Sequence, residues 1–279
     1  MTLAHPAFGA RLRAAMDDRG PLCVGVDPHP GLLKDWDLTD DAKGLERFAM
    51  TAVEAVAPQV AMLKPQSAFF ERHGSAGIAV LERLVAHAHD AGCLVLLDVK
   101  RGDIGSTMQA YADAYLDPAS PLACDAVTVS PYLGFGSLDP VIDTATLHGR
   151  GVFVLALTSN PEGPEVQQAR SAAGGTVAGS VLAQIAARND DAEPMGSVGA
   201  VVGATIGDTD EDLDVNGPLL VPGLGAQGGT VDDVRRIFAG VQHLVVPTTS
   251  RDVLAAGPAT DALASRARRV ADDLSRLVG

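Results

Sequence analysis

Aromatic side chains and basic charge are both scarce in this chain of 279 residues. Phe, Tyr and Trp make up only 4% of the sequence, against 47% for all hydrophobic residues. The core must therefore be aliphatic, which favours layered α/β packing over a sandwich rich in Trp and Tyr. The 21 Lys and Arg residues face 35 Asp and Glu residues, for a net charge of −14. This balance argues against nucleic acid as a partner, because neutralising phosphates needs a basic face.

Cysteine is also rare, and signal-like or membrane-spanning segments are missing. Cys23, Cys93 and Cys124 are widely spaced in apolar runs, which predicts buried free thiols. The first twenty residues hold no apolar core of signal-peptide length, and no stretch is long enough to cross a membrane. We therefore expect no membrane association and a cytoplasmic location. The histidines lack metal-ligand spacing and are expected on the surface or in packing: His29, His73, His87, His89 and His243.

Eight short apolar runs alternate with helical patterns along the chain. The predicted strands are 22–26, 60–63, 94–99, 126–129, 151–157, 198–202, 219–221 and 244–246. Helices are predicted at 5–18, 40–57, 75–91, 106–116, 137–148, 176–188, 208–214 and 260–277, with a further helix capped by Thr230 and Asp233. No run alternates strictly between apolar and polar residues, as a half-exposed antiparallel strand would.

Eight strand–helix units predict an α/β fold, a TIM (β/α)8 barrel forming a single domain over 1–279. A doubly wound open sheet is the alternative, but no GxGxxG opens the first helix. Polar residues also follow nearly every strand, as the rim of a barrel requires. The segment 160–175 is the one long irregular loop and a candidate lid.

The stretch 94–107, LVLLDVKRGDIGST, places charge at the end of a buried strand. Asp98 and Lys100 share one face, because successive strand side chains point to opposite faces. Burying an acid and a base there costs stability unless they pair or take part in chemistry. Asp103 follows within the same loop. Ser106 and Gln109 are then expected to form a capping box that opens the next helix.

A barrel would gather the polar residues at its strand ends around one mouth, where two lysines and three aspartates would form an alternating charge network. These residues are Asp27, Lys64, Asp98, Lys100, Asp103, Ser130, Ser159, Thr205, Gln227 and Arg251. The loop GLGAQGG and Arg251 follow the seventh and eighth strands, where such barrels usually bind phosphate. Taken singly, Asp27 could be a helix cap, Lys64 a solvated rim lysine and GLGAQGG a flexible loop.

The segment 98–107, DVKRGDIGST, resembles the active-site signature of the orotidine 5′-phosphate decarboxylase family, most closely its longer bacterial subgroup. Weaker matches follow in the same order along the chain: VGVDP, LKPQSAFFE, LTSNPEG, PGLGAQGG and TTSR. The resemblance implies a TIM barrel, usually a homodimer. Such an enzyme decarboxylates orotidine 5′-phosphate (OMP) to UMP in pyrimidine biosynthesis without a metal or an organic cofactor.

Carried over residue by residue, the resemblance implies four catalytic residues: Lys64, Asp98, Lys100 and Asp103. Lys100 would protonate C6 and Asp98 would lie against the departing carboxylate, while Asp103 and Thr107 would reach into the neighbouring subunit's site. Asp27 and Lys64 would contact the ribose, and Arg251 would grip the phosphate. The implied substrate-binding residues are Asp27, Ile104, Thr107, Ser159, Pro222, Gln227, Gly228 and Arg251.

The chain departs from the common family pattern at Val99 and Met108, where Ala is usual, and we expect packing differences only. Two other functions stay open. One is a Mg²⁺-dependent sugar-phosphate decarboxylase or aldolase of the same superfamily, which shares the Asp-x-Lys-x-x-Asp motif. The other is a catalytically silent barrel that binds a nucleotide. A Schiff-base aldolase using Lys64 or Lys100 is disfavoured, because flanking carboxylates hold a lysine protonated.

Overall fold

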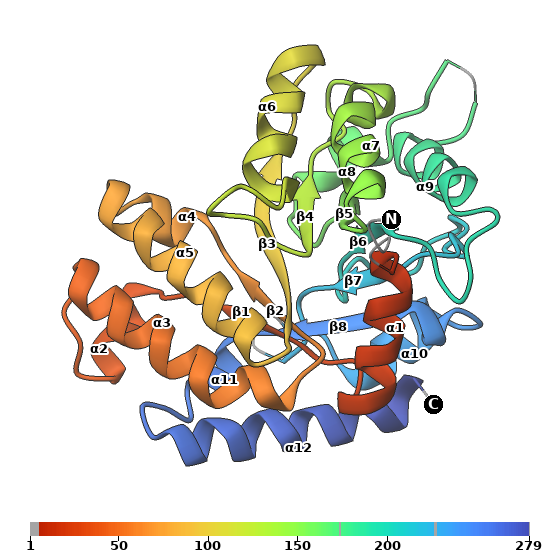
Figure 1. The fold of residues 1–279 in the computed structure, drawn as a ribbon. Coiled ribbons are helices and arrows are strands. Elements are labelled where there is room, and N and C mark those ends of the chain that lie inside the picture. The colour runs from red at the N-terminus through yellow and green to blue at the C-terminus, as the bar shows by residue number, and fades with distance from the viewer. Residues whose placement is uncertain (1–5, 173, 226–227, 279) are drawn as a thin grey trace.

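The computed structural model describes residues 6–172, 174–225 and 228–278. Its eight parallel strands close into a barrel in sequence order, with β8 pairing back onto β1 (Figure 1). The predicted TIM barrel is therefore confirmed, and the open-sheet alternative is wrong. The strands are β1 (Cys23–Val26), β2 (Met62–Pro65), β3 (Leu94–Arg101), β4 (Ala126–Val129), β5 (Gly151–Leu157), β6 (Val198–Val202), β7 (Leu219–Val221) and β8 (Val245–Thr249).

Helices surround the barrel and connect its strands (Figure 1). They are α1 (Phe8–Arg19), α2 (Pro30–Asp35), α3 (Ala42–Val56), α4 (Ala68–Glu71), α5 (Gly74–Asp90), α6 (Gly105–Leu116), α7 (Asp139–Leu147), α8 (Gly163–Gln167), α9 (Val177–Arg188), α10 (Val231–Ile237), α11 (Arg251–Leu254) and α12 (Thr260–Val278). Three 3₁₀ turns, Ala57–Gln59, Phe135–Leu138 and Gln242–Leu244, complete the elements of the described residues. The predicted capping box of Thr230 and Asp233 at α10 is confirmed.

Three local predictions differ from the structure. Helix α6 begins at Gly105 with Ile104 as its N-cap, so Ser106 already lies inside the first turn and forms no capping box. No helix forms over 208–214, where Asp208 and Asp212 would be like charges four residues apart, which destabilises a helix. The segment 160–175 is not wholly irregular, because it contains α8.

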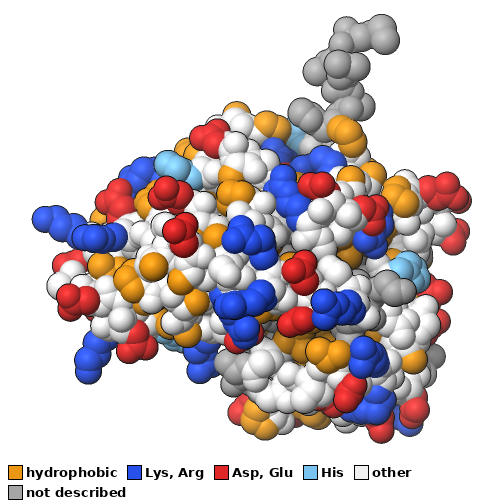
Figure 2. Space-filling model, turned by 90° about the horizontal axis from the view of Figure 1, so that it is seen from below, with side chains coloured by type: hydrophobic (Ala, Val, Ile, Leu, Met, Phe, Trp, Pro, Cys, Tyr) orange, Lys and Arg blue, Asp and Glu red, His pale blue; other side chains and the backbone are white. Residues whose placement is uncertain are grey.

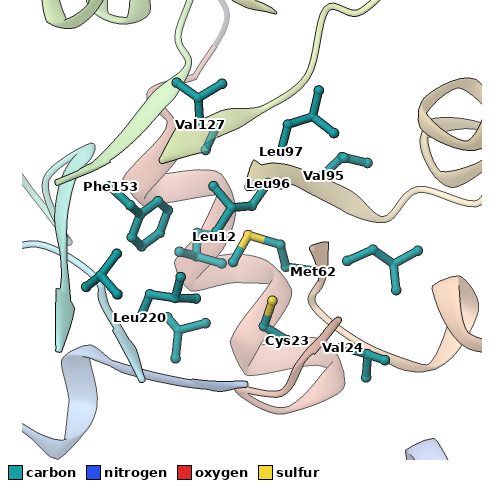
Figure 3. Packing of buried hydrophobic residues seen from close by; sticks show 14 of the residues in the cluster. Leu12, Cys23, Val24, Met62, Val95, Leu96, Leu97, Val127, Phe153 and Leu220 are labelled. Carbon is teal, nitrogen blue, oxygen red and sulfur yellow. The ribbon is translucent and has the colours of Figure 1, made fainter. Parts of the chain in front are cut away.

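The barrel interior is aliphatic, as the scarcity of aromatic residues predicted. Figure 3 shows Leu12, Met62, Leu96 and Leu220 converging on the axis from α1 and from three different strands. All four side chains are at most 1% exposed. The helices cover the outer faces of the strands, so that β1, β2 and β4 are buried along their whole length. This rigid core supports the loops that follow the strands.

Helix α1 covers the N-terminal end of the barrel. Phe8 packs edge-on against Phe153 of β5, with ring centroids 6.0 Å apart. Arg13 donates to the carbonyl of His243 before β8, and Arg19 donates to the carbonyl of Gly92 before β3. These contacts close the end of the barrel opposite the mouth formed by the strands' C-terminal ends.

The face seen in Figure 2 mixes basic and acidic side chains, so the negative net charge is not concentrated there.

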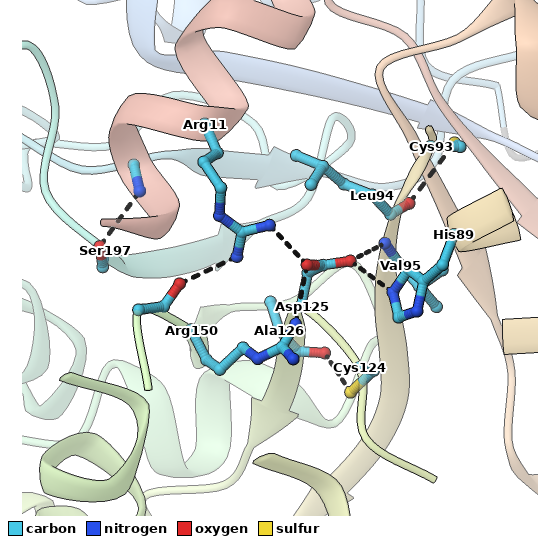
Figure 4. Close-up of polar contacts among 12 residues, drawn as sticks. Arg11, His89, Cys93, Leu94, Val95, Cys124, Asp125, Ala126, Arg150 and Ser197 are labelled. Carbon is cyan, nitrogen blue, oxygen red and sulfur yellow. Dashed lines mark hydrogen bonds and ion pairs between the residues drawn. The ribbon is translucent and has the colours of Figure 1, made fainter. Parts of the chain in front are cut away.

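Asp125, directly before β4, ties α1 to the barrel through a buried carboxylate (Figure 4). Its Oδ1 accepts hydrogen bonds from Arg11 at 2.6 Å and Arg150 at 2.9 Å. Its Oδ2 accepts the Val95 backbone N–H and lies 2.9 Å from His89 Nε2. Burial alone would raise the pKa of Asp125, but the contacts with His89 and Arg11 outweigh burial and hold this pKa well below its ordinary value.

The charge on Asp125 should make stability depend on pH. Because the folded-state pKa is lowered, this stabilisation is present above the ordinary pKa of about 4 and is lost as pH falls below it. Asp125→Asn should lower the free energy of unfolding by about 3 kcal/mol at pH 7, since two arginines lose their counter-charge. It should also reduce the loss of stability as pH falls below about 4. Thermal melts over about pH 3 to 7 measure this. Asp90→Asn, an exposed change, should keep the wild-type slope, and parallel curves for Asp125→Asn would contradict the prediction.

Candidate active site

The C-terminal ends of the strands surround a cavity of about 280 Å³. All eight strands, and several of the loops directly after them, contribute residues to its wall, as expected for the mouth of a TIM barrel. Seven of the predicted site residues line it: Asp27, Lys64, Asp98, Lys100, Ser159, Pro222 and Arg251. These residues are far apart in the sequence, and the closed barrel brings them together.

Asp98 is the centre of the charge network. Its Oδ2 accepts a hydrogen bond from Lys64 Nζ at 3.0 Å, and its Oδ1 accepts one from Lys100 Nζ at 2.5 Å. A third hydrogen bond reaches Oδ1 from the hydroxyl of Thr128 at 2.8 Å. Asp98 and Lys64 are buried, at 6% and 7% exposed, whereas the Lys100 side chain is 46% exposed. Lys100 therefore presents its ammonium group to the cavity.

Burial and neighbouring charges act in opposite directions on the pKa values of Asp98 and Lys64. Burial favours the neutral forms, but Lys64 and Lys100 outweigh it and hold the pKa of Asp98 well below its usual range. Burial likewise opposes the charge on Lys64, but Asp98 and Asp27 outweigh it and raise the pKa of Lys64. Lys64 is thus an ammonium ion in the core and not a solvated rim lysine. Because both carboxylate oxygens of Asp98 face ammonium groups, a cation would have to displace a lysine to bind there.

Part of the cavity wall carries polar oxygens that have no hydrogen-bond partner among the described residues. They are Asp27 Oδ1, Ser159 Oγ, Thr249 Oγ1 and Ser250 Oγ. Buried polar atoms are normally paired, so a cluster of unpaired ones indicates a place for a polar ligand. The backbone leaves room for the Ser159 hydroxyl, because a Cβ on Gly203 would lie only 2.1 Å from its oxygen.

Several predicted residues lie away from the cavity. Asp103 is half-buried and accepts the Ile104 backbone N–H at 2.8 Å, while Ile104 and Thr107 are exposed. These three follow β3 and do not line the cavity within this chain. The same holds for Ser130, Thr205 and Gly228, while Gln227 lies outside the described residues. The two departures from the family pattern, Val99 and Met108, are both buried.

The structure adds cavity residues that the sequence reading missed. Thr128 and Gln66 line the wall beside Asp98, and Thr249 and Ser250 line it beside Arg251. His29, expected on the surface or in packing, is exposed but also lines the mouth and stacks edge-on against Phe69 with ring centroids 4.2 Å apart. Thr128 could have been noticed in the sequence, because it is the polar residue of a four-residue apolar strand.

Within the described part of the chain, no group of three or more His, Cys, Asp and Glu side chains is arranged to hold a metal ion. The protein is a TIM-barrel enzyme, and the mouth of its closed barrel holds a buried carboxylate between two ammonium groups, as suits an anion-binding site. The model of the orotidine 5′-phosphate decarboxylase / HUMPS family matches residues 20–265, and the chain belongs to this family.

Similar proteins cover nearly the whole chain. An orotidine 5′-phosphate decarboxylase from a Nocardioides species is 69% identical over 250 residues, which span 88% of this chain and 91% of the relative. The Streptomyces coelicolor protein of the same name is 59% identical, with 97% and 98% of the two chains covered. A crystal structure from Streptomyces avermitilis, described as the same kind of enzyme, is 58% identical with a TM-score of 0.97 over 99% of this chain and 97% of that one.

Proposed function

We propose that this chain catalyses the cofactor-independent decarboxylation of OMP to UMP and CO2, a step of de novo pyrimidine biosynthesis. The observation that carries the proposal is the position of Asp98 between Lys64 and Lys100 at the barrel mouth. The 69% identity to the Nocardioides protein named orotidine 5′-phosphate decarboxylase supports the same function. The relatives described above do not support a Mg²⁺-dependent sugar-phosphate enzyme or a catalytically silent barrel.

Lys100 fits the role of proton donor. When the bond from C6 to the carboxylate carbon breaks, its electron pair stays on C6 in the plane of the ring, where the ring π-system does not delocalise it. An ammonium group fixed beside C6 stabilises this charge and then transfers its proton there. The Lys100 ammonium faces the cavity and is held by Asp98 at 2.5 Å, which restricts its position before substrate binds.

Asp98 and Lys64 complete the reacting end of the site. Asp98 is ionised, and a second carboxylate placed against it is repelled, which favours departure of that carboxylate as CO2. Lys64 offsets the negative charge that two neighbouring carboxylates would accumulate. Asp27, whose Oδ1 has no partner among the described residues, would accept a hydrogen bond from a ribose hydroxyl, and Lys64 would donate one to the ribose.

The remaining predicted site residues fit the substrate's other groups. Ser159 would hold the pyrimidine, while Pro222 and Gly228, which follow β7, and Arg251, which begins α11 after β8, would hold the phosphate end with Gln227. A guanidinium group binds phosphate through two parallel hydrogen bonds. Binding energy from the phosphate, remote from C6, can offset the electrostatic cost of placing the substrate carboxylate beside Asp98.

Arg251→Ala should weaken binding of OMP by about 100-fold, because a charged hydrogen bond to phosphate contributes about 1.5–3 kcal/mol. The same change should have little effect on orotidine, which has no phosphate. Steady-state kinetics and competition binding with both compounds measure the difference. Arg235→Ala removes an exposed arginine of α10 and serves as the control. Equal losses for OMP and orotidine would remove Arg251 from the phosphate site.

The active form is proposed to be a homodimer in which Asp103 and Thr107 enter the partner's site. Asp103 does not line the cavity of its own chain. Beside it, Ile104 is 62% exposed, and Tyr132 and Leu133, in the loop after β4, are 78% and 53% exposed. The loops after β3 and β4 are adjacent, since the Ser130 N–H donates to the Arg101 carbonyl. Large apolar side chains grouped at one rim favour contact with another protein surface.

A cytoplasmic location is also proposed. Cys23, Cys93 and Cys124 are free thiols in the structure, as is usual for proteins in a reducing compartment. Among the helices of the described residues, none combines the length and the apolar character that crossing a membrane demands.

The proposed function is tested by following the loss of OMP absorbance in EDTA. Full activity with EDTA is expected, because the reacting end of the site works through lysine and aspartate side chains. Strict dependence on added Mg²⁺ would favour the sugar-phosphate enzymes instead. UMP binding without OMP turnover would favour the silent barrel.

A further inference from the structure

Strand β3 bulges where it carries the charged residues. Leu97 pairs with Val127 and Arg101 pairs with Val129, so three residues of β3 lie opposite the single residue Thr128 of β4. The last of these three, Lys100, has a φ of +46°, a conformation that residues other than glycine rarely adopt. The regular ladder of hydrogen bonds cannot hold such a segment, which needs another support.

The Thr128 side chain provides that support. Its Oγ1 accepts hydrogen bonds from the backbone N–H groups of Val99 at 3.0 Å and Lys100 at 2.9 Å. The same hydroxyl donates to Asp98 Oδ1 at 2.8 Å. A hydroxyl has one donor and two acceptor sites, so all of its hydrogen-bonding capacity is used. The residue is 1% exposed, which keeps water from replacing these bonds.

We propose that Thr128 is a positioning residue for the proton donor Lys100. The Lys100 ammonium is located by its own backbone and by Asp98 Oδ1, and the Thr128 hydroxyl bonds to both. One side chain thus couples the unusual backbone of Lys100 to the carboxylate oxygen that holds its Nζ. The proposal rests on the proposed decarboxylation, in which Lys100 delivers the proton to C6.

A merely structural role predicts a different outcome from a positioning role. If Thr128 only stabilised the barrel, its loss would lower the melting temperature and leave kcat of the folded enzyme unchanged. If it positions Lys100, its loss should lower kcat and leave KM nearly unchanged, because the proposed contacts with the phosphate, ribose and pyrimidine are made by other residues, and Thr128 hydrogen-bonds to none of them. A displacement of about 1 Å at a catalytic group can cost about 100-fold in rate.

The test compares three substitutions with the wild-type enzyme, whose own turnover of OMP first establishes the proposed function. Thr128→Val keeps the shape and loses the hydroxyl, Thr128→Cys replaces it by a weak hydrogen-bonding thiol, and Thr128→Ser retains it. Thr144→Val is the matched control, because Thr144 is also buried and its hydroxyl bonds to the Pro140 carbonyl on α7. Thermal melts and steady-state kinetics are measured for each protein.

We expect kcat to fall about 10- to 100-fold in Thr128→Val and less in Thr128→Cys, with KM within about threefold of wild type. Thr128→Ser and Thr144→Val should keep kcat within about twofold. A normal kcat in folded Thr128→Val overturns the proposal, as does a loss that Thr128→Ser shares or that appears mainly in KM. If Thr128→Val does not fold, Thr128→Cys decides: reduced kcat supports the proposal and normal kcat overturns it.

Discussion

Lys100→Ala is expected to reduce the turnover of OMP by about 10⁴-fold or more, because it removes both the proposed proton donor and the charge proposed to stabilise the carbanion. General acid catalysis contributes about 10²–10⁴-fold, and a fixed electrostatic group contributes about 10²–10³-fold. The fold should survive this change. The Lys100 side chain is 46% exposed, and Asp98 keeps its ion pair with Lys64.

Lys100→Arg separates the two contributions of Lys100. Arginine keeps a positive charge near C6 but does not release a proton at the pH of the assay. It should therefore bind OMP and lose only the contribution of proton donation, about 10²–10⁴-fold, so that it turns over more slowly than wild type but faster than Lys100→Ala. Single-turnover assays with OMP, together with UMP binding, measure both properties, and the exposed change Lys34→Ala serves as the control. A near-normal rate in either Lys100 variant would remove this residue as the proton donor.

The barrel and much of its mouth could be predicted because they follow from local patterns. Each buried strand is a short apolar run, and polar residues follow nearly every run, so the pattern places Asp27, Lys64 and Ser159 at the same rim. Alternation along a strand predicts that Asp98 and Lys100 share a face, and the two side chains do contact each other, although β3 bulges there and Lys100 has a φ of +46°. The structure adds the distances that join Asp98 to two lysines and the burial of Lys64.

Other features depend on contacts between distant segments, which local patterns do not reveal. The role of Thr128 depends on the register between β3 and β4, and a bulge of three residues is not visible in either strand alone. The start of α6 at Gly105 likewise depends on how the loop leaves β3, since the pattern of Ser106 and Gln109 fits an N-cap two residues later than the observed N-cap, Ile104. The buried contacts of Asp125 join residues up to 114 positions apart.

Asp103 poses the remaining question about the site, because it follows β3, which carries Asp98 and Lys100, but does not line the cavity of its own chain. If it completes the site of a partner subunit, Lys100→Ala and Asp103→Ala should each be inactive alone and active when mixed. In a hybrid dimer, one site combines Lys100 of one chain with Asp103 of the other, and the second site lacks both. Random exchange makes half of the dimers hybrid, so about one quarter of wild-type activity should return.

The matched control mixes Lys100→Ala with Asp98→Asn. Lys100 and Asp98 contact each other within one chain at 2.5 Å, so no hybrid of these two variants contains an intact site and no activity should return. Subunit exchange is driven by brief dilution and checked by native mass spectrometry, and OMP turnover is then measured. If hybrid dimers of the Lys100→Ala and Asp103→Ala variants form without any recovery, Asp103 acts within its own chain, and the proposed exchange of residues across the interface is wrong.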